Sequence, residues 1–106
     1  MKLGLVIYIA DSETAWNAFR LGIFSLKQGD AVSAFLLGKG VECSGIDTAS
    51  FKVTEMMEQF AAAGGELLAC GTCLQLRHSE GGGVCSISTM ADLHRLVREC
   101  DKVLTF

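Results

Sequence analysis

Two cysteines separated by two residues, Cys70 and Cys73, form the motif of this sequence that is best suited to chemistry. The thiolate is the nucleophilic form of cysteine, and a helix N-terminus or a neighbouring cation stabilises it. Cys70 follows the mostly apolar residues 66–69, and Arg77 lies further along the same segment. If that segment is helical, its backbone N–H groups and the Arg77 guanidinium both favour a thiolate. We therefore predict that Cys70 is a nucleophile, with Cys73 about one helical turn away.

A Cys-x-x-Cys pair also occurs in dithiol redox proteins and in zinc sites. The thioredoxin fold places a cis-proline against its cysteine pair, and this chain contains no proline, which argues against that fold. A zinc ion would need Cys70, Cys73, His78 and Cys85 as its four ligands. The spacing between the two halves of that set is short, and no second Cys-x-x-Cys is present. We expect no metal and no other cofactor, while a dithiol redox protein and a metal-binding module stay open as alternatives.

The other three cysteines have simpler interpretations. Cys43 lies in the glycine-rich segment 38–45, where we expect it to be exposed and able to approach Cys70 across the strand ends. Cys85 and Cys100 are expected to pack in the core, because cysteine behaves as a small hydrophobic residue. The odd number of cysteines and the lack of a recognisable secretion signal favour a reducing compartment, so we expect a cytoplasmic protein.

The elements that would position these residues alternate between strand and helix. Nearly continuous apolar runs are typical of strands covered on both faces, as in parallel sheets. The last helix is expected to turn Leu93, Leu96 and Val97 inward, and the glycine triplet 81–83 to form a turn. Strands are predicted over residues 3–9, 31–37, 66–69, 84–87 and 102–106, and helices over residues 12–28, 50–62, 71–78 and 89–100. This alternation predicts a three-layer α/β/α fold with a mainly parallel sheet of about five strands.

The carboxyl ends of parallel strands meet at one edge of the sheet, which is where ligands bind in such folds. Three segments with little core character fall at that edge, one after each of the first three strands. We therefore expect a binding group around Cys70 and Cys73 that consists of Asp11, Gly38, Gly40, Cys43 and Arg77.

Length and composition limit the possible functions. The chain has 106 residues, which suits a single domain over residues 1–106. Half of its residues are apolar, which points to buried strands or to a subunit interface. The net charge of −3 provides no basic surface stripe, so nucleic acid is not an expected partner. The apolar runs stay well short of the ~20 residues that a membrane helix needs, so no membrane span is expected.

Several segments together resemble the DsrE/DsrF-like family of sulfur-relay proteins. The most specific part is the junction of a strand, Cys70 and a helix, followed by Arg77. The ending is also characteristic, since a helix leads into an Asp-basic-Val-Leu-x-Phe strand. The resemblance spans the opening strand and first helix and residues 31–37, 38–41, 65–70, 93–100 and 101–106.

This resemblance implies that Cys70 carries a persulfide and passes its sulfur to a partner. Cys73 departs from the family pattern, because many members have a small residue there, and a second thiol could resolve a persulfide as a disulfide. The family also implies sulfur donor and acceptor proteins as partners and assembly into homotrimers or homohexamers. We therefore expect a cytoplasmic sulfur carrier with a possible sulfurtransferase activity. The alternatives are a dithiol redox protein or sensor using Cys70 and Cys73, and a non-catalytic oligomeric or metal-binding module.

Overall fold

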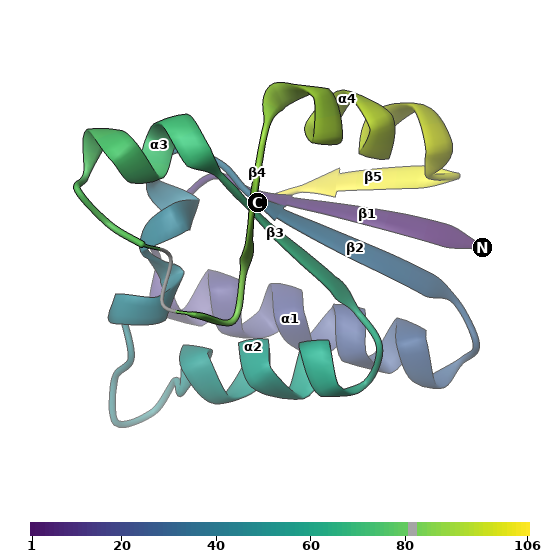
Figure 1. Ribbon diagram of the computed structural model, residues 1–106. Helices are drawn as coiled ribbons and strands as arrows, with labels where there is room; N and C mark the ends of the chain where they lie inside the picture. Colours follow the sequence, from purple (N-terminus) through teal and green to yellow (C-terminus); the bar gives the residue numbers. More distant parts are fainter. Residues whose placement is uncertain (81–82) are drawn as a thin grey trace.

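A parallel sheet of five strands forms the middle layer of the computed structural model, which describes residues 1–80 and 83–106 (Figure 1). The strand order is β4-β3-β2-β1-β5, and every neighbouring pair is parallel. The strands are β1 (Lys2–Ile7), β2 (Ala31–Leu36), β3 (Glu66–Cys70), β4 (Ser86–Ser88) and β5 (Lys102–Thr105). The predicted parallel α/β sheet is confirmed.

Helices cover both faces of this sheet, which completes the predicted three layers. Helices α1 (Ser12–Lys27) and α2 (Val53–Ala62) lie side by side on one face, and α4 (Met90–Glu99) lies on the other (Figure 1). The 3₁₀ helix η1 (Gly38–Gly45) follows β2, and the short helix α3 (Gly71–Leu76) follows β3. These two helices contact each other, so the carboxyl ends of β2 and β3 share one neighbourhood. None of the described helices is long and apolar enough to cross a membrane.

The core holds β3 firmly between two layers. Five of the six residues of β1 and four of the five of β3 are buried, as expected for strands covered on both faces. Helices α1 and α2 meet through an edge-to-face contact of Phe19 and Phe60, whose ring centroids are 5.6 Å apart. Gly22 lets Phe60 approach α1, since a Cβ there would lie 2.8 Å from the ring. Because β3 is packed in this way, its last residue, Cys70, has a fixed position.

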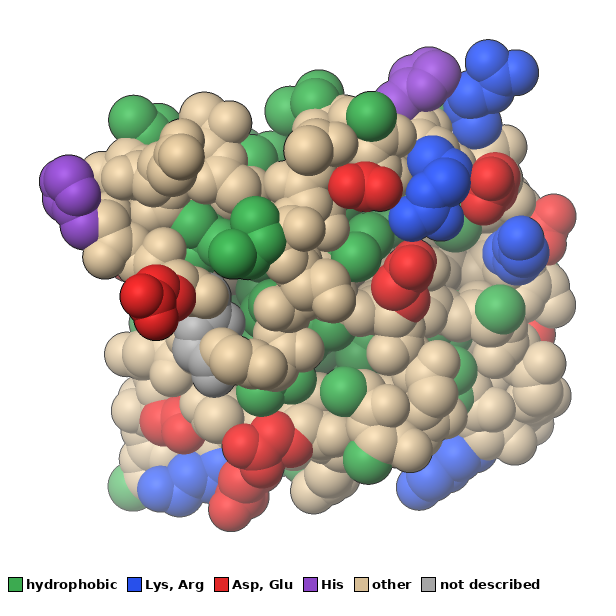
Figure 2. All heavy atoms as spheres, viewed as in Figure 1, with side chains coloured by type: hydrophobic (Ala, Val, Ile, Leu, Met, Phe, Trp, Pro, Cys, Tyr) green, Lys and Arg blue, Asp and Glu red, His purple; other side chains and the backbone are tan. Residues whose placement is uncertain are grey.

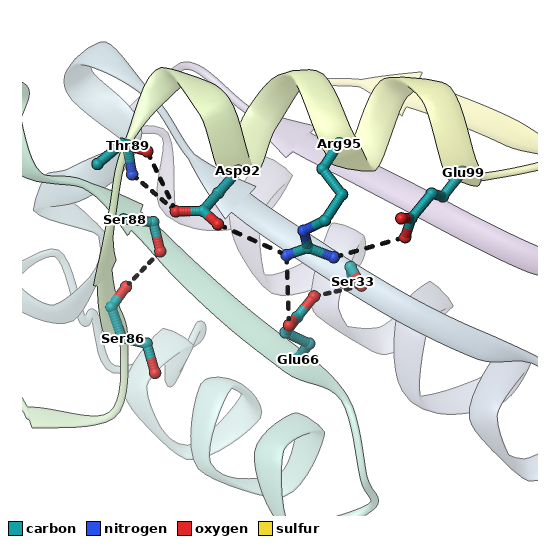
Figure 3. A network of polar contacts seen from close by, with 8 residues as sticks. All are labelled: Ser33, Glu66, Ser86, Ser88, Thr89, Asp92, Arg95 and Glu99. Atoms are coloured by element: carbon teal, nitrogen blue, oxygen red, sulfur yellow. Dashed lines mark hydrogen bonds and ion pairs between the residues drawn. The ribbon is translucent and has the colours of Figure 1, made fainter.

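Polar contacts fix α4 over the opposite face (Figure 3). Thr89 and Asp92 form a capping box at the start of the helix, which satisfies N–H groups that would otherwise lack partners. Arg95 lies 3.7 Å from Glu66 of β3, and it also pairs with Asp92 and Glu99. Ser33 of β2 donates a hydrogen bond to Glu66 at 2.8 Å. The network therefore connects α4 to two strands and fixes the point where β4 ends.

Three expectations from the sequence need correction or comment. Residues 38–45, predicted as a loop, form η1 and bury Val41 and Cys43. Val97 is 53% exposed, because Leu96 takes the core position over Gly4 and the next residue along α4 turns toward solvent. The turn predicted at residues 81–83 lies largely outside the described residues.

Candidate functional site

Cys70 lies at the carboxyl end of β3, where it pairs in register with Ser88 of β4. It is also the N-cap residue of α3, with an extended backbone at φ −62° and ψ 115°. Only 4% of its surface is exposed, yet it lines a cavity of about 330 Å³ between α3, β4 and the start of α4. The other residues that line this cavity are Gly71, Thr72, Leu74, Gln75, Ser79, Ile87, Ser88, Thr89 and Met90. This cavity therefore offers a reactant a route to Cys70.

Cys73 lies one turn further along α3 and is half-buried. Its Sγ accepts a hydrogen bond from the backbone N–H of Gly38 at 3.3 Å, which joins η1 to α3. Burial raises the pKa of the Cys73 thiol, and a side-chain hydrogen bond with Cys70 raises it further. The Gly38 N–H and the Arg77 cation act in the opposite direction, because both favour the thiolate. Cys70 therefore contributes to the raised pKa of Cys73.

Gly38 belongs to this site for a backbone reason. Its φ is +58°, in the left-handed region that glycine adopts most readily. A Cβ at this position would lie 2.8 Å from the ring of Tyr8, so a side chain would also be crowded. Gly40 serves a different contact, because a Cβ there would overlap the carbonyl of Ile7. Of the two predicted glycines, Gly38 reaches the cysteine pair and Gly40 packs against the end of β1.

Arg77 bridges η1 and α3. Its Nε donates to Glu42 Oε2 at 2.8 Å, and its terminal nitrogen donates to the carbonyl of Cys73 at 3.2 Å. The sequence assigned this cation to Cys70, whereas its electrostatic effect in the structure is on Cys73. A second, larger hollow of about 490 Å³ lies beside Arg77 and Glu42, and Ser79 lines both hollows. The guanidinium therefore stands between the cysteine pair and an open cavity.

Two predicted binding residues lie elsewhere. Asp11 caps α1, where its carboxylate accepts hydrogen bonds from the Thr14 backbone N–H at 2.9 Å and hydroxyl at 2.7 Å. These bonds hold the pKa of Asp11 below its ordinary value, because they favour the carboxylate. Cys43 is fully buried, so the expectation that it is exposed is wrong. Burial raises the pKa of Cys43 to about 12, with smaller contributions from Cys85 and Glu42.

The ligand set considered for zinc does not come together in the part of the chain that the structure describes. No group of three or more His, Cys, Asp or Glu side chains within residues 1–80 and 83–106 could hold a metal ion. His78 is exposed just after α3, and burial raises the pKa of Cys85 to about 11. The chemistry of the site therefore rests on two thiols, a backbone N–H and an arginine.

Comparison with known families decides where this arrangement belongs. The family model described as the DsrE/DsrF-like family matches residues 1–106. This chain belongs to the DsrE/DsrF-like family. Two relatives are similar over most of their length. The uncharacterized protein MK0008 of Methanopyrus kandleri is 33% identical over 89% of this chain and 83% of its own. The uncharacterized protein MJ0989 of Methanocaldococcus jannaschii is 30% identical over the whole of both chains.

Solved structures of DsrE-like fold match the same architecture. The ychN protein of E. coli superimposes with a TM-score of 0.84 at 24% identity and covers all of both chains. BT1422 of Bacteroides thetaiotaomicron, a conserved protein of unknown function, gives a TM-score of 0.84 at 18% identity, over 99% of this chain and 94% of that one. Membership of the DsrE/DsrF-like family suggests a role of the sulfur-relay type, in which members typically work with partner proteins.

The structure adds site residues that the sequence did not single out. Glu42 pairs with Arg77 across 35 positions of sequence, and no local pattern marks such a pair. Ile87 and Met90 line the Cys70 cavity although they are 67% and 61% exposed, and Leu76 on α3 is 75% exposed. Figure 2 shows exposed hydrophobic side chains over α3, β4 and the start of α4. In the sequence, the only indication of this apolar surface was the presence of large apolar residues next to a polar turn.

Proposed function

We propose that this DsrE/DsrF-like protein is a small sulfur carrier that holds sulfane sulfur as a persulfide on Cys70 and passes it to a partner protein. The observation that carries the proposal is the position of Cys70, which ends a buried strand and lines the 330 Å³ cavity. A rigid strand presents the sulfur in one place, and the cavity leaves room for a second sulfur atom beside it. The family match supports the same role.

The transfer is a displacement at sulfur with no net oxidation. The Cys70 thiolate attacks the terminal sulfur of a sulfane donor, a new S–S bond forms, and the donor leaves as the thiolate or shortened anion that lost its sulfur. Delivery is the same step in reverse order, with an acceptor thiolate attacking the outer sulfur and Cys70 leaving. The site needs no metal or organic cofactor for either step, and reduced thiols fit a cytoplasmic setting.

Partner proteins would dock on the apolar rim around the cavity. Leu76, Ile87 and Met90 are all more than half exposed and belong to α3, β4 and α4. Such residues favour contact with another protein, since exposed apolar groups gain free energy when they leave water. Assembly into a homotrimer or homohexamer remains part of the proposal. Phe24 and Tyr8, which are 62% and 57% exposed, offer further apolar surface for it.

The test is sulfur loading followed by intact mass. In a Cys73→Ser chain, which leaves one thiol at the site, anaerobic inorganic polysulfide should add the mass of one sulfur atom. The Cys70→Ser/Cys73→Ser chain should add none. Cys73→Ser/Cys100→Ser is the matched control, because Cys100 packs under α4 outside the Cys70 cavity, and it should load like Cys73→Ser. Equal loading of the chain without Cys70 would overturn the proposal.

A dithiol redox protein is the second candidate, and the position of Cys70 and Cys73 about one helical turn apart favours it. In that role the two thiols would lose two hydrogens to an external oxidant and never hold sulfur. Treating the Cys73→Ser chain with polysulfide separates the two candidates. Stable gain of sulfur supports the carrier, and no gain supports the redox protein.

A further inference from the structure

We propose that Cys73 discharges the persulfide on Cys70 as hydrogen sulfide, which makes this protein a sulfide-releasing persulfide reductase as well as a carrier. The inference rests on the proposed function, because it requires a persulfide at Cys70. It goes beyond that function, because sulfur would leave the protein as a free small molecule without an acceptor protein.

The geometry brings the second thiol to the first. Cys70 is the N-cap residue of α3 and Cys73 is the third residue of that helix, so their side chains lie on the same side of the first turn. Cys70 also raises the pKa of the Cys73 thiol, so the two side chains are close enough to influence each other. In addition, the Gly38 N–H reaches Cys73 Sγ at 3.3 Å and orients that sulfur from the η1 side. An attacking thiol is therefore held next to its target before any sulfur is bound.

Two contacts favour the thiolate that this attack needs, while burial keeps the pKa of Cys73 above its ordinary value. The Gly38 N–H and the Arg77 guanidinium both favour the thiolate of Cys73, against the opposing effects of burial and of Cys70. Arg77 is itself held in place by Glu42 and by the Cys73 carbonyl. The Gly38 N–H thus acts on the Cys73 sulfur from η1, and Arg77 acts on it from the end of α3.

The proposed step balances in atoms and electrons. The Cys73 thiolate attacks the inner sulfur of the persulfide, the Cys70–Cys73 bond forms, and the bond to the outer sulfur breaks. The outer sulfur leaves with the electron pair as hydrosulfide, so it is reduced by two electrons while the two cysteines become a disulfide. A dithiol reductant then supplies two electrons and two protons, and it restores both thiols.

Access favours this internal route. Cys70 is 4% exposed, so an external thiol must enter the narrow cavity to reach the persulfide, whereas Cys73 lies beside it. A reactant held in place reacts as if it were present at very high concentration. The protein would therefore release sulfide whenever an acceptor protein fails to engage the cavity in time.

The experiment follows sulfur and mass together. The full chain and the Cys73→Ser chain are reduced, treated anaerobically with inorganic polysulfide, desalted, and then followed for intact mass and released sulfide. We expect the full chain to lose two hydrogens and to release one sulfide per chain, while Cys73→Ser keeps the added sulfur and releases none. Dithiothreitol should return the full chain to its starting mass and allow a second round.

Two further variants make the outcome decisive. Cys73→Ala should behave like Cys73→Ser, and Cys100→Ser should behave like the full chain. If the full chain keeps its added sulfur as long as Cys73→Ser does, the inference is wrong and the carrier function stands. If Cys73→Ser and Cys73→Ala both fold but take up no sulfur, the carrier function fails, and the inference fails with it.

Discussion

Two pairs of cysteines, Cys70 with Cys73 and Cys43 with Cys85, have different surroundings. Cys70 lines a cavity, and Cys73, one turn further along α3, accepts a hydrogen bond from a backbone N–H and lies within the influence of Arg77. Cys43 is fully buried on η1, and Cys85 packs against the same core. Burial raises the pKa of Cys43 to about 12 and that of Cys85 to about 11. Burial is the main cause of the raised pKa of Cys43 and Cys85, whereas Cys70 lines a cavity and a backbone N–H and an arginine oppose the raised pKa of Cys73.

The comparison shows that a cysteine-rich edge of a sheet need not be reactive throughout. A thiol that loses water and gains no cation or N–H partner stays protonated. Sequence position is a weak guide here, since Cys43 lies among glycines and Cys70 among leucines, yet Cys70 is the one that lines a cavity.

The largest expected effect is on alkylation. A shift of the Cys43 pKa from 9.0 to about 12 lowers its thiolate fraction at neutral pH by about a thousandfold. With a limiting alkylating agent, Cys70 and Cys73 should both react before Cys43, which stays unlabelled until the protein unfolds. Peptide mass mapping over time measures this order, and rapid labelling of Cys43 in the folded chain would break the comparison.

Replacing sulfur by oxygen should affect the two pairs differently. Cys43→Ser puts a hydroxyl into a fully buried apolar site, and a buried hydroxyl without a partner costs about 1–3 kcal/mol of the free energy of unfolding. Cys73→Ser should change the free energy of unfolding by less than about 0.5 kcal/mol, because that side chain is half-buried and the serine oxygen can still accept a hydrogen bond from the Gly38 N–H. Urea unfolding measures the free energy of unfolding of both variants. Equal losses would contradict the view that Cys43 lies in a buried apolar site and Cys73 does not.

Gly38→Ala tests the connection between η1 and the reactive pair. A left-handed backbone at φ +58° costs an alanine about 1–2 kcal/mol, and the Tyr8 ring must also move. Gly45→Ala is the matched control on the same 3₁₀ helix, where a Cβ meets nothing within 4 Å. We expect Gly38→Ala to lower the unfolding midpoint and to alter Cys73 labelling, and Gly45→Ala to change neither.

The smallest effect is expected for Arg77→Gln. Its partly exposed ion pair with Glu42 contributes about 0.2–1 kcal/mol to stability at most. Removal of the cation raises the pKa of Cys73 further, so less thiolate is present at a given pH and Cys73 alkylation slows. The rate of Cys73 alkylation should recover as the pH rises toward the pKa of the Cys73 thiol. Cys43 should be unaffected, and a faster Cys73 reaction in Arg77→Gln would reverse the sign of this argument.

Much of the fold could be predicted from local pattern. The nearly continuous apolar runs of β1, β2 and β3 are typical of strands covered on both faces. Asp11 and Thr89 are residue types that favour the N-cap position, and they cap α1 and α4. The parallel layers follow from the alternation of these elements.

The rest depends on contacts between distant residues. The glycines of residues 38–45 indicate a loop, but they also permit η1 to pack close to Ile7 and to bury Cys43. Val97 lost its core position because Gly4 makes room for Leu96, a fit that the helix sequence does not reveal. The pairing of Arg77 with Glu42 likewise exists only once η1 and α3 meet.

The pairing of β1 with β5 has a mechanical consequence. The two strands are parallel and lie side by side from Leu3 opposite Lys102 to Val6 opposite Thr105. Tension applied between Lys2 and Thr105 would pull the strands lengthwise past each other. The hydrogen bonds between them would then bear the load together rather than open one at a time. A molecule stretched in this direction should resist until the whole strand pair gives way in a single event.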